Sequence, residues 1–425
     1  MFDIRRFKIV LVMALLVTAG ACAADVPEGS AGATTTYTDD AGLQAEARRI
    51  HDSVLIVDTH VDISRRFVVE VDPCGPTDWQ VDVPKMVDGG MDVAFFIVYV
   101  GQGERTPEGH AAAKATALER FTAIRRMAEE LCPDAIEIAY STDDVARINA
   151  AGKRVAVIGM ENGYMVGRDL SLLRQYHDLG ARYLTLSHNG HNEISDSANP
   201  RSGEPESEHG GLSPFGEEVV REMNRLGMMV DVSHISGAAV LDAVRVSQSP
   251  VIASHSAVQG VVPIPRNLGD DQLRAIAAGG GVVQVVGLGA FVRLPEPEKV
   301  AALDALRAEV GIVGYADWQR LTDEERSEYR RRAAEIDERW PGGSVSDLVD
   351  HIDYAVDLIG IDHVGISSDF DGGGGVVGWE NAAETLNVTL ELVRRGYSES
   401  EIEQLWGGNL MRVWRENERL ATAAR

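Results

Sequence analysis

The residues of this sequence that could carry out chemistry are histidines and carboxylates at the ends of short apolar segments. These segments end in VDTHVD, IGMENG, TLSHNGHN, VDVSH, IASHS and GISSDFDG, and they supply His60, Asp62, Glu161, His188, His191, His234, His255, Asp369 and Asp371. Neutral imidazole and carboxylate groups are the usual protein ligands of Zn²⁺ and similar ions. A single histidine of this kind is more often a hydrogen-bonded structural residue, but five of the 11 histidines occur here. Because so much charge in one place is unfavourable without a cation, we predict a metal site, and we expect two ions.

The pair His60 and Asp62 supports this prediction by its spacing. The two residues are separated by one position, so in an extended strand both side chains lie on the same face. One ion can therefore take both as ligands.

The elements that must position these residues are short apolar runs that alternate with segments of helical periodicity. The runs are Val54–Val57, Val93–Val100, Val155–Met160, Tyr183–Leu186, Met228–Val232, Val251–Ala253, Val282–Val286 and Val364–Ser367. The helical segments include Gly109–Leu131, Ser171–Leu179, Phe215–Leu226, Gly237–Val246, Asp270–Ala278 and Val345–Ile359. Such alternation is typical of parallel βαβ units whose strands are buried on both faces. Eight repeats predict a (β/α)8 TIM barrel, with an open doubly wound sheet as the alternative.

A barrel would also bring the polar residues together. The C-terminal ends of its strands converge on one mouth, where the active sites of barrel enzymes lie. Six of the eight runs end in the residues named above, so we expect those residues to share that mouth.

Two further segments have a plain structural interpretation. The connection of residues 287–345 contains LTDEERSEYRRRAAEIDERW, with charges at helical i,i+4 spacing, and we predict a solvated helix in an insertion before strand 8. The four glycines Gly372–Gly375 lack the spacing of a dinucleotide fingerprint, and we interpret them as a mobile loop.

The composition excludes several classes of protein. The chain has 425 residues, with 44% hydrophobic and 25% charged residues, as in soluble globular proteins. Its 40 Lys and Arg residues against 66 Asp and Glu residues give a formal net charge of −26. A surface that binds nucleic acid is rich in Lys and Arg, so we expect no nucleic-acid partner.

The N-terminal segment MFDIRRFKIVLVMALLVTAGACAA has the layout of a secretory signal peptide. Its apolar run, Ile9–Val17, is shorter than the ~20 residues that a spanning helix needs. Cleavage fits an A-x-A site at Ala21–Ala23 or a bacterial lipobox, which would leave Cys22 as a lipid anchor. We expect a signal peptide at residues 1–22, a flexible tether at 23–40 and one barrel domain at 41–425.

We therefore expect the chain to be exported, either to the periplasm, outside the cell or onto a membrane as a lipoprotein of a bacterium. An oxidising compartment permits disulfides. The sequence leaves open whether Cys74 and Cys132 form one.

Taken together, the motifs resemble those of the membrane dipeptidase (renal dipeptidase) family, peptidase family M19. The similar segments are VDTHVDI, GMENGY, RYLTLSHNGHNEISDS, VDVSHIS, IASHSAV, PRNLGDDQL, HVGISSDFDG and GGNLMRVW, from about residue 53 to 415. The resemblance implies a (β/α)8 barrel and a zinc-dependent dipeptidase, which hydrolyses the peptide bond of dipeptides with a hydroxide that bridges two Zn²⁺ ions. Relatives often form homodimers, which makes a homodimer a candidate state.

The same resemblance implies a set of metal ligands. His60 and Asp62 should bind the first zinc ion, and His234 and His255 the second. Glu161, which has two carboxylate oxygens, should bridge both ions.

The resemblance also implies residues that act on the substrate. His188 corresponds to a residue near the scissile carbonyl, where it can donate to the developing oxyanion. Arg266 corresponds to the clamp on the substrate's C-terminal carboxylate, which its planar guanidinium matches; without the resemblance we would interpret it as part of a surface salt bridge. Asp369 corresponds to the acid/base residue that contacts the substrate and passes a proton to the leaving amine. His191, Asp196 and Asp371 are weaker candidates, and Asp371 is also suited to fixing its loop through backbone hydrogen bonds.

Two alternatives stay open at this point. One is another binuclear amidohydrolase-like deacylase or amidase, but such barrels usually carry H-x-H on the first strand and often a modified bridging lysine. The other is a binding protein that keeps the fold without catalysis, which the loss of a ligand would reveal. All five expected metal ligands are present in the sequence.

Overall fold

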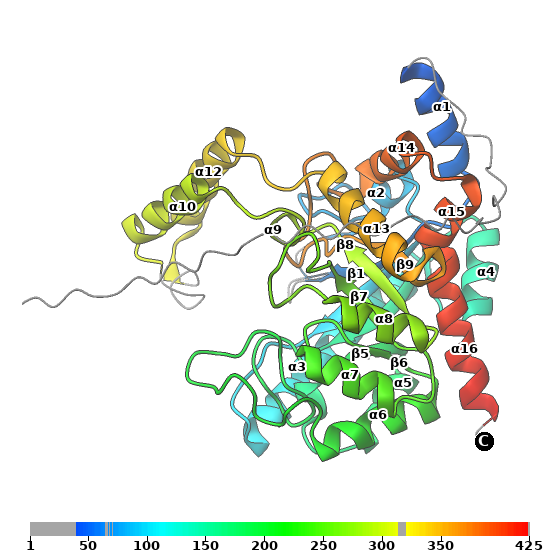
Figure 1. The fold of residues 1–425 in the computed structure, drawn as a ribbon, viewed down its shortest axis with the longest axis vertical. Helices are drawn as coiled ribbons and strands as arrows, with labels where there is room; N and C mark the ends of the chain where they lie inside the picture. Colours follow the sequence, from blue (N-terminus) through cyan, green and yellow to red (C-terminus); the bar gives the residue numbers. More distant parts are fainter. Residues whose placement is uncertain (1–39, 64–66, 68, 70, 313–319, 424–425) are drawn as a thin grey trace, which may run out of the picture. The chain divides into compact units, whose positions relative to one another are not determined.

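The computed structural model describes residues 40–63, 67, 69, 71–312 and 320–423. Its centre is a sheet of eight parallel strands: β1 (Val57–Asp62), β2 (Val93–Tyr99), β4 (Arg154–Glu161), β5 (Ala181–Thr185), β6 (Met229–Asp231), β7 (Ile252–Ser256), β8 (Val282–Val286) and β9 (Val364–Ser367). Each strand pairs with the next in this order. Figure 1 shows helices around these strands. Val61 forms a parallel bridge with Phe370, and its neighbour Asp62 donates its N–H to the Phe370 carbonyl at 2.8 Å, which joins the last strand to the first. The predicted (β/α)8 barrel is confirmed.

The strand predictions differ from the structure mainly at the first and shortest strands. β8 and β9 have the predicted bounds, whereas the first strand is Val57–Asp62 instead of Val54–Val57. The polar residues of VDTHVD are therefore part of the strand and do not follow it. A ninth strand, β3 (Ile136–Ile138), was not predicted; it pairs with the first residues of β4, outside the ring.

Helices follow the barrel strands as the periodicity predicts. They are α3 (Pro107–Arg126), α5 (Ser171–Asp178), α6 (Pro214–Leu226), α7 (Gly237–Val246), α8 (Asp270–Ala278) and α13 (Val345–Ile359). Further helices are α1 (Asp40–His51), α2 (Val83–Asp88), α4 (Thr142–Ala150), α14 (Leu386–Arg394), α15 (Glu399–Glu403) and α16 (Asn409–Ala423). Several begin at a Ser or Thr cap; in α3 the Thr106 side chain accepts the Gly109 N–H and Pro107 follows the cap.

The barrel interior is apolar at its base and polar toward its mouth. Val57, Phe95, Val157, Tyr183 and Met229 form one buried cluster inside the ring with residues of α16. Phe95 stacks on Tyr183 with ring centroids 5.6 Å apart. This packed base supports the polar residues that follow on the same strands.

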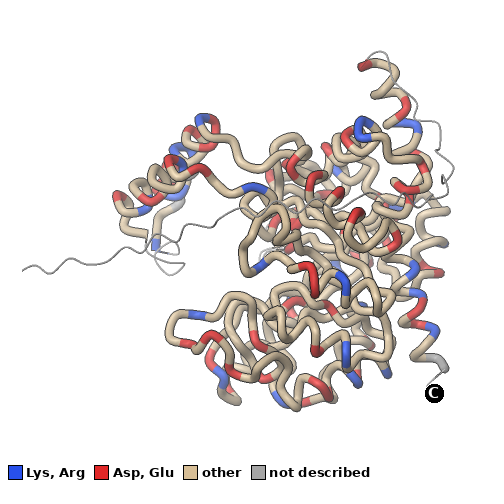
Figure 2. The backbone as a smooth tube through the Cα atoms, viewed as in Figure 1, with Lys and Arg blue, Asp and Glu red and all other residues tan. Residues whose placement is uncertain are grey.

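The insertion before the eighth barrel strand contains α9 (Gly289–Val292), α10 (Pro297–Glu309) and α12 (Asp323–Arg339). Ion pairs join α10 to α12, at 2.6 Å between Arg332 and Glu309 and at 2.8 Å between Lys299 and Asp337. Charges of both signs are interspersed along these two helices (Figure 2). The predicted solvated helix is confirmed as α12.

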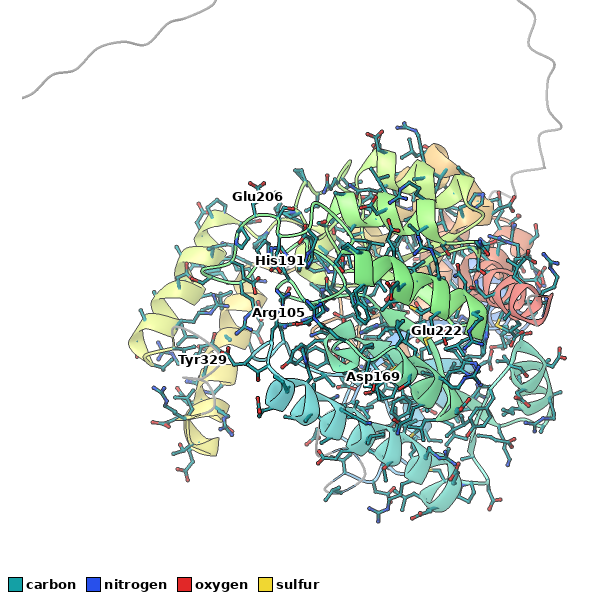
Figure 3. The ribbon with its side chains drawn as sticks, turned by 90° about the horizontal axis from the view of Figure 1, so that it is seen from below. Arg105, Asp169, His191, Glu206, Glu222 and Tyr329 are labelled. Atoms are coloured by element: carbon teal, nitrogen blue, oxygen red, sulfur yellow. A yellow bond between two sulfur atoms is a disulfide. The ribbon has the colours of Figure 1, made fainter. Side chains whose placement is uncertain are left out.

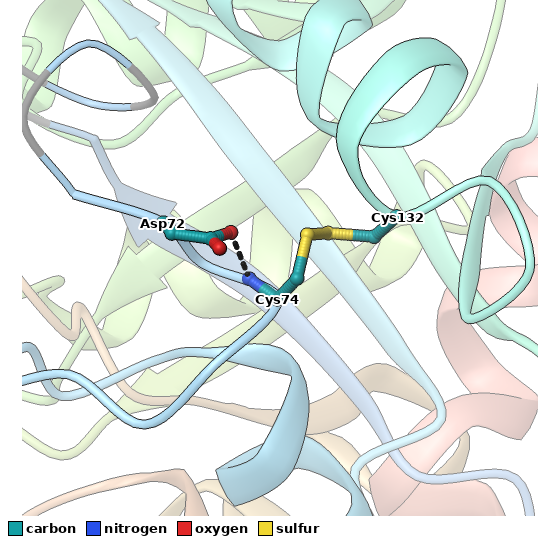
Figure 4. Close-up of a disulfide and its surroundings, with 3 residues drawn as sticks. All are labelled: Asp72, Cys74 and Cys132. Carbon is teal, nitrogen blue, oxygen red and sulfur yellow. Dashed lines mark hydrogen bonds between the residues drawn. A yellow bond between two sulfur atoms is a disulfide. The ribbon is translucent and has the colours of Figure 1, made fainter.

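A disulfide joins Cys74, in the connection after β1, to Cys132 (Figure 4). It ties this connection to the end of the π-helical segment Met127–Leu131, which continues α3. The pairing that the sequence left open is therefore present.

The expected signal peptide, with Cys22, and residues 23–39 of the expected tether lie outside the described residues, and Asp40 begins α1. Among the described residues, no helix has the length and hydropathy required to cross a membrane.

Candidate active site

The predicted metal ligands, together with His188 and Asp369, lie at the C-terminal ends of the barrel strands, whereas Arg266 lies in the connection between β7 and α8. His60 and Asp62 belong to β1, Glu161 ends β4 and His255 lies in β7. His188, His234 and Asp369 follow β5, β6 and β9 within three residues. The structure thus brings residues from six strands into one mouth.

Two of these histidines lie in stretches where the pairing between strands is irregular. The register of β1 against β2 shifts between Asp58 and Val61, a stretch that contains His60. The register of β7 against β8 shifts between Ala253 and Ser256, a stretch that contains His255. Shifts of this kind re-aim side chains next to active sites.

One group of ligand atoms surrounds the buried Nε2 atom of His60. This atom lies 3.6 Å from Asp62 Oδ2, 3.8 Å from Glu161 Oε2 and 3.8 Å from Asp369 Oδ1. It has no hydrogen-bond partner. These separations are longer than hydrogen bonds, but atoms that bind one zinc ion at about 2.0–2.1 Å lie about 3.4 Å apart in tetrahedral geometry. The group therefore fits a cation.

A second group surrounds the other oxygen of Glu161. Glu161 Oε1 lies 3.0 Å from His234 Nε2 and 3.3 Å from His255 Nε2, and these two nitrogens are 2.9 Å apart. Two imidazole nitrogens and one carboxylate oxygen that converge in this way also fit a cation. The two oxygens of Glu161 thus face different groups, as expected of a bridging ligand.

Charge is concentrated in this buried space. Burial raises the pKa of Asp369 to about 7, and it also raises the pKa of Glu161. Burial lowers the pKa of His60, but the carboxylates of Glu161 and Asp62 outweigh it and raise this pKa to about 9. A divalent cation among these carboxylates would stabilise their charged forms.

His188 lies beside the second group. Its Nε2 atom is 3.9 Å from Glu161 Oε1, farther than the corresponding atoms of His234 and His255. Its side chain is 18% exposed, more than those of the other two. Burial, together with the charge of Arg266, lowers the pKa of His188 to about 3. A neutral imidazole at this place can donate one N–H to a ligand in the mouth.

Arg266 is buried, and the surface salt bridge expected from its residue type alone is not what the structure has. Its guanidinium donates to Ser256 Oγ and to the His255 carbonyl, both at 2.8 Å, and lies over the Phe291 ring. Burial lowers the pKa of Arg266 to about 10, although the charges of Glu161 and Asp369 act to raise it. The arginine is therefore fixed within electrostatic reach of the site.

Unusual backbone conformations gather at this mouth. Among the described residues other than glycine, those with positive φ are Asn162 (79°), His234 (67°), Asp369 (59°) and Asp371 (61°). Each follows a barrel strand, and three of them, His234, Asp369 and Asp371, are candidates from the sequence. Strain of this kind is typical of positions where function fixes the side chain.

Comparisons with known proteins agree with this geometry. The family model of membrane dipeptidases, peptidase family M19, matches residues 44–425. The chain belongs to this family. A dipeptidase of Claviceps purpurea, tcpJ, is 31% identical over 389 residues, which are 90% of this chain and 79% of that one. The crystal structure of the probable dipeptidase PvdM from Pseudomonas aeruginosa is 34% identical with a TM-score of 0.80, and the match covers 90% of this chain and 100% of that one.

A more distant structure shares the fold. It is a metallopeptidase from Rhodobacter sphaeroides bound to a phosphinate mimic of the dipeptide L-Ala-D-Ala, 23% identical with a TM-score of 0.67 over 86% of this chain and 99% of that one. Membership of the family makes this chain a metal-dependent hydrolase that acts on dipeptides.

In this dipeptidase, the weaker candidates are structural. His191 is fully buried; its Nδ1 accepts the Ser197 N–H at 3.0 Å and its Nε2 lies 2.9 Å from the Pro205 carbonyl. Asp371 accepts the backbone N–H groups of Gln80 at 3.0 Å and Val81 at 3.2 Å. The second interpretation of Asp371, that it fixes the loop, agrees with these contacts.

Gly372 was not predicted as part of the site. A β-carbon at this position would overlap Asp62 Oδ2 and Asp369 Oδ1. The glycine run is a loop, as predicted, but hydrogen bonds fix its backbone. The N–H of Gly374 donates to the Asp369 carbonyl at 2.8 Å, and that of Gly375 donates to the Gly287 carbonyl at 2.7 Å. The glycine run itself was the signal that a close approach occurs here.

A separate cavity of about 820 Å³ lies between the start of α3 and the loops after β4 and β5. Arg105 and Asp169, both labelled in Figure 3, line it. None of the predicted site residues lines this cavity, so it is not the reaction site.

Proposed function

We propose that this dipeptidase binds two divalent cations and that both are Zn²⁺. With them it hydrolyses dipeptides that have a free C-terminal carboxylate. The observation that carries the proposal is the orientation of Glu161, whose two oxygens face two separate groups of ligand atoms. His60 and Asp62 would hold one ion, and His234 and His255 the other.

When bound, such ions act as Lewis acids that activate a water molecule and polarise a carbonyl oxygen. The other roles belong to side chains of the chain itself. His188 donates an N–H to the carbonyl oxygen of the scissile bond, where negative charge develops in the transition state.

Asp369 moves the proton. Its carboxylate is buried in the mouth, with Oδ1 3.8 Å from His60 Nε2 in the first group of ligand atoms. A carboxylate that reaches the attacking water can both accept and release a proton. Asp369 therefore takes a proton from the attacking water and delivers it to the leaving amine.

Arg266 selects the length of the substrate. A guanidinium binds a carboxylate through two parallel hydrogen bonds. The clamp requires the carboxylate one residue beyond the scissile bond, which favours dipeptides over longer peptides.

A panel of dipeptides tests this function. The panel pairs L-Ala-L-Ala with L-Ala-D-Ala, because a mimic of the latter is bound in the Rhodobacter structure, and it adds a tripeptide and a C-terminal amide as controls. Hydrolysis of dipeptides alone, abolished by a chelator and restored by Zn²⁺, supports the proposal. Equal hydrolysis of the amide, or activity that survives metal removal, contradicts it.

We further propose that the chain is exported, with residues 1–22 as the signal. The disulfide between Cys74 and Cys132 supports this, because such bonds persist in oxidising compartments. Mass spectrometry of the mature N-terminus separates the options: a lipidated Cys22 indicates an anchored lipoprotein, cleavage after Ala23 indicates soluble export, and an intact N-terminus contradicts both.

A further inference from the structure

A layer of buried polar side chains lies inside the barrel directly beneath the metal-binding groups. It consists of Thr59 on β1, Tyr183 and Thr185 on β5, Asp231 on β6 and Ser254 on β7, all fully buried. The reaction described above uses none of them. Their hydrogen bonds lead to two of the predicted ligands, His60 and His255.

Asp231 is surrounded by donors. Its Oδ1 atom accepts the backbone N–H groups of Ser233 at 3.1 Å and Ser254 at 2.8 Å. Its Oδ2 atom accepts the hydroxyl of Thr185 at 2.5 Å and that of Ser254 at 2.6 Å. The carboxylate is therefore the acceptor in each of these contacts.

This arrangement sets the direction of the next hydrogen bond. Ser254 Oγ lies 2.8 Å from His255 Nδ1. A hydroxyl has one hydrogen, and the Ser254 hydrogen is donated to Asp231. The Ser254 oxygen must then accept a hydrogen from His255 Nδ1, which leaves the lone pair of this ring on Nε2.

The free lone pair points to the second group of ligand atoms. His255 Nε2 lies 3.3 Å from Glu161 Oε1 and 2.9 Å from His234 Nε2. With the other tautomer, a hydrogen on Nε2 would occupy the position from which the ring binds a cation.

We propose that the chain Asp231–Ser254–His255 is a positioning device, which holds His255 in the tautomer that binds metal through Nε2. The inference rests on the proposed role of His255 as a ligand. A ligand histidine commonly donates its second N–H to a fixed acceptor, and loss of that acceptor weakens metal binding by about 10–100-fold. Here a serine hydroxyl stands between the histidine and the carboxylate.

The first group of ligand atoms contains a similar contact. His60 Nδ1 lies 2.9 Å from Tyr183 Oη, which donates to the Thr59 carbonyl at 2.9 Å. Tyr183 therefore accepts from His60 and directs its Nε2 to the carboxylates. A cross-barrel hydrogen bond from Thr59 Oγ1 to the Ser254 carbonyl, at 2.7 Å, joins the two strands that carry these histidines.

The test compares three variants in the metal-free protein and during zinc titration. Ser254→Ala removes the acceptor of His255 Nδ1, and Ser254→Thr retains a hydroxyl. Thr185→Val is the matched control, because it removes a hydroxyl from Asp231 without touching a histidine. We expect Ser254→Ala to weaken zinc binding at one site by about 10–100-fold, Ser254→Thr to restore most of the affinity, and Thr185→Val to bind zinc as the wild type does.

Histidine tautomers are read by two-bond ¹⁵N–¹H correlation spectra of the metal-free protein at neutral pH. We expect wild-type His255 to carry its hydrogen on Nδ1, and the Ser254→Ala protein to show a shift toward Nε2–H. A wild-type His255 with its hydrogen on Nε2 overturns the proposal, and this measurement needs no variant to fold.

The zinc titration separates this proposal from the proposed function. If the wild type binds two zinc ions and Ser254→Ala binds both with unchanged affinity, the positioning role is wrong and the metal centre stands. If the wild type binds no zinc ion, the metal centre itself is wrong.

Discussion

Glu161 Oε1 lies 3.0 Å from Nε2 of His234, whereas the other carboxylate oxygen of Glu161 faces His60. Because β4 ends at this residue, the carboxylate projects into the mouth between the strands that carry the histidines. A single buried carboxylate thus connects two groups of ligand atoms. This relationship supports the proposed centre with two cations.

Substitution of Asp369 tests its proposed role as the residue that transfers the proton. We expect Asp369→Asn to retain the fold and to lower kcat by about 10²–10⁴, the usual contribution of a general acid/base group. Asparagine keeps the size of the side chain but cannot accept and release the proton. Zinc content and kcat should be measured together, since Asp369 Oδ1 also lies near His60. Wild-type kcat in this variant would eliminate the acid/base role.

Substitution of Arg266 tests its proposed binding of the substrate's C-terminal carboxylate. We expect Arg266→Met to raise KM for a dipeptide by about 10-fold or more, a loss in the range of a charge-assisted hydrogen bond. Methionine also removes the hydrogen bonds to Ser256 and the His255 carbonyl, so KM alone does not isolate the clamp. The decisive comparison is between a dipeptide and its C-terminal amide. The wild type should prefer the free carboxylate and the variant should not; a variant that keeps the full preference would exclude Arg266 as the clamp.

Gly372 tests the close approach of the loop to the carboxylates. Its φ is not positive, so alanine introduces no backbone strain there, but the added methyl group would displace Asp62 or Asp369. We expect Gly372→Ala to lower zinc affinity by at least about 10-fold, in the range seen when the supports of a metal ligand are disturbed. The control is Gly75→Ala, where a β-carbon meets nothing within 4 Å. Equal zinc affinity in the two variants would show that the loop tolerates a side chain at this position.

Asp196 links stability to pH at the loop after β5. Burial raises the pKa of Asp196, but hydrogen bonds from Ser207 and from the backbone of Glu208, His209 and Gly211 outweigh it and hold this pKa below its ordinary value. A lowered pKa stabilises the folded state fully above the ordinary pKa of about 3.9, and this contribution is lost as the pH falls through the folded-state pKa.

We therefore expect Asp196→Asn to destabilise the protein by about 1–3 kcal/mol at neutral pH, the range for a buried acceptor of several hydrogen bonds. Urea unfolding at neutral and at acid pH measures this. The difference between variant and wild type should shrink at acid pH, and a difference that grows there would reverse the predicted sign.

The fold could be predicted from sequence where hydrophobic patterning alone determines the structure. β8 has the predicted bounds because four of the five residues of Val282–Val286 are valines, with Gln284 as the exception. The first strand was placed too early because VDTHVD is polar, and its polar residues are stabilised by partners on distant strands. β3 was missed because three residues that pair outside the ring leave little pattern.

The residues proposed as metal ligands could be predicted from the sequence, but the residues that support them could not. His60, Glu161 and His255 are recognisable because their residue types recur at the ends of apolar runs. Tyr183 and Ser254 have no such signal, since their contacts with the histidines depend on strands that are distant in sequence and on the register shifts that turn the rings.

The proposed function requires two zinc ions, with Glu161 as their shared ligand. The most direct measurement is a titration of Zn²⁺ into the chelator-treated protein, with hydrolysis of L-Ala-L-Ala followed at each addition. We expect activity to rise until about two ions are bound per chain, as in two-metal hydrolases. Activity that is complete with one ion bound, or that is present with none, would contradict it.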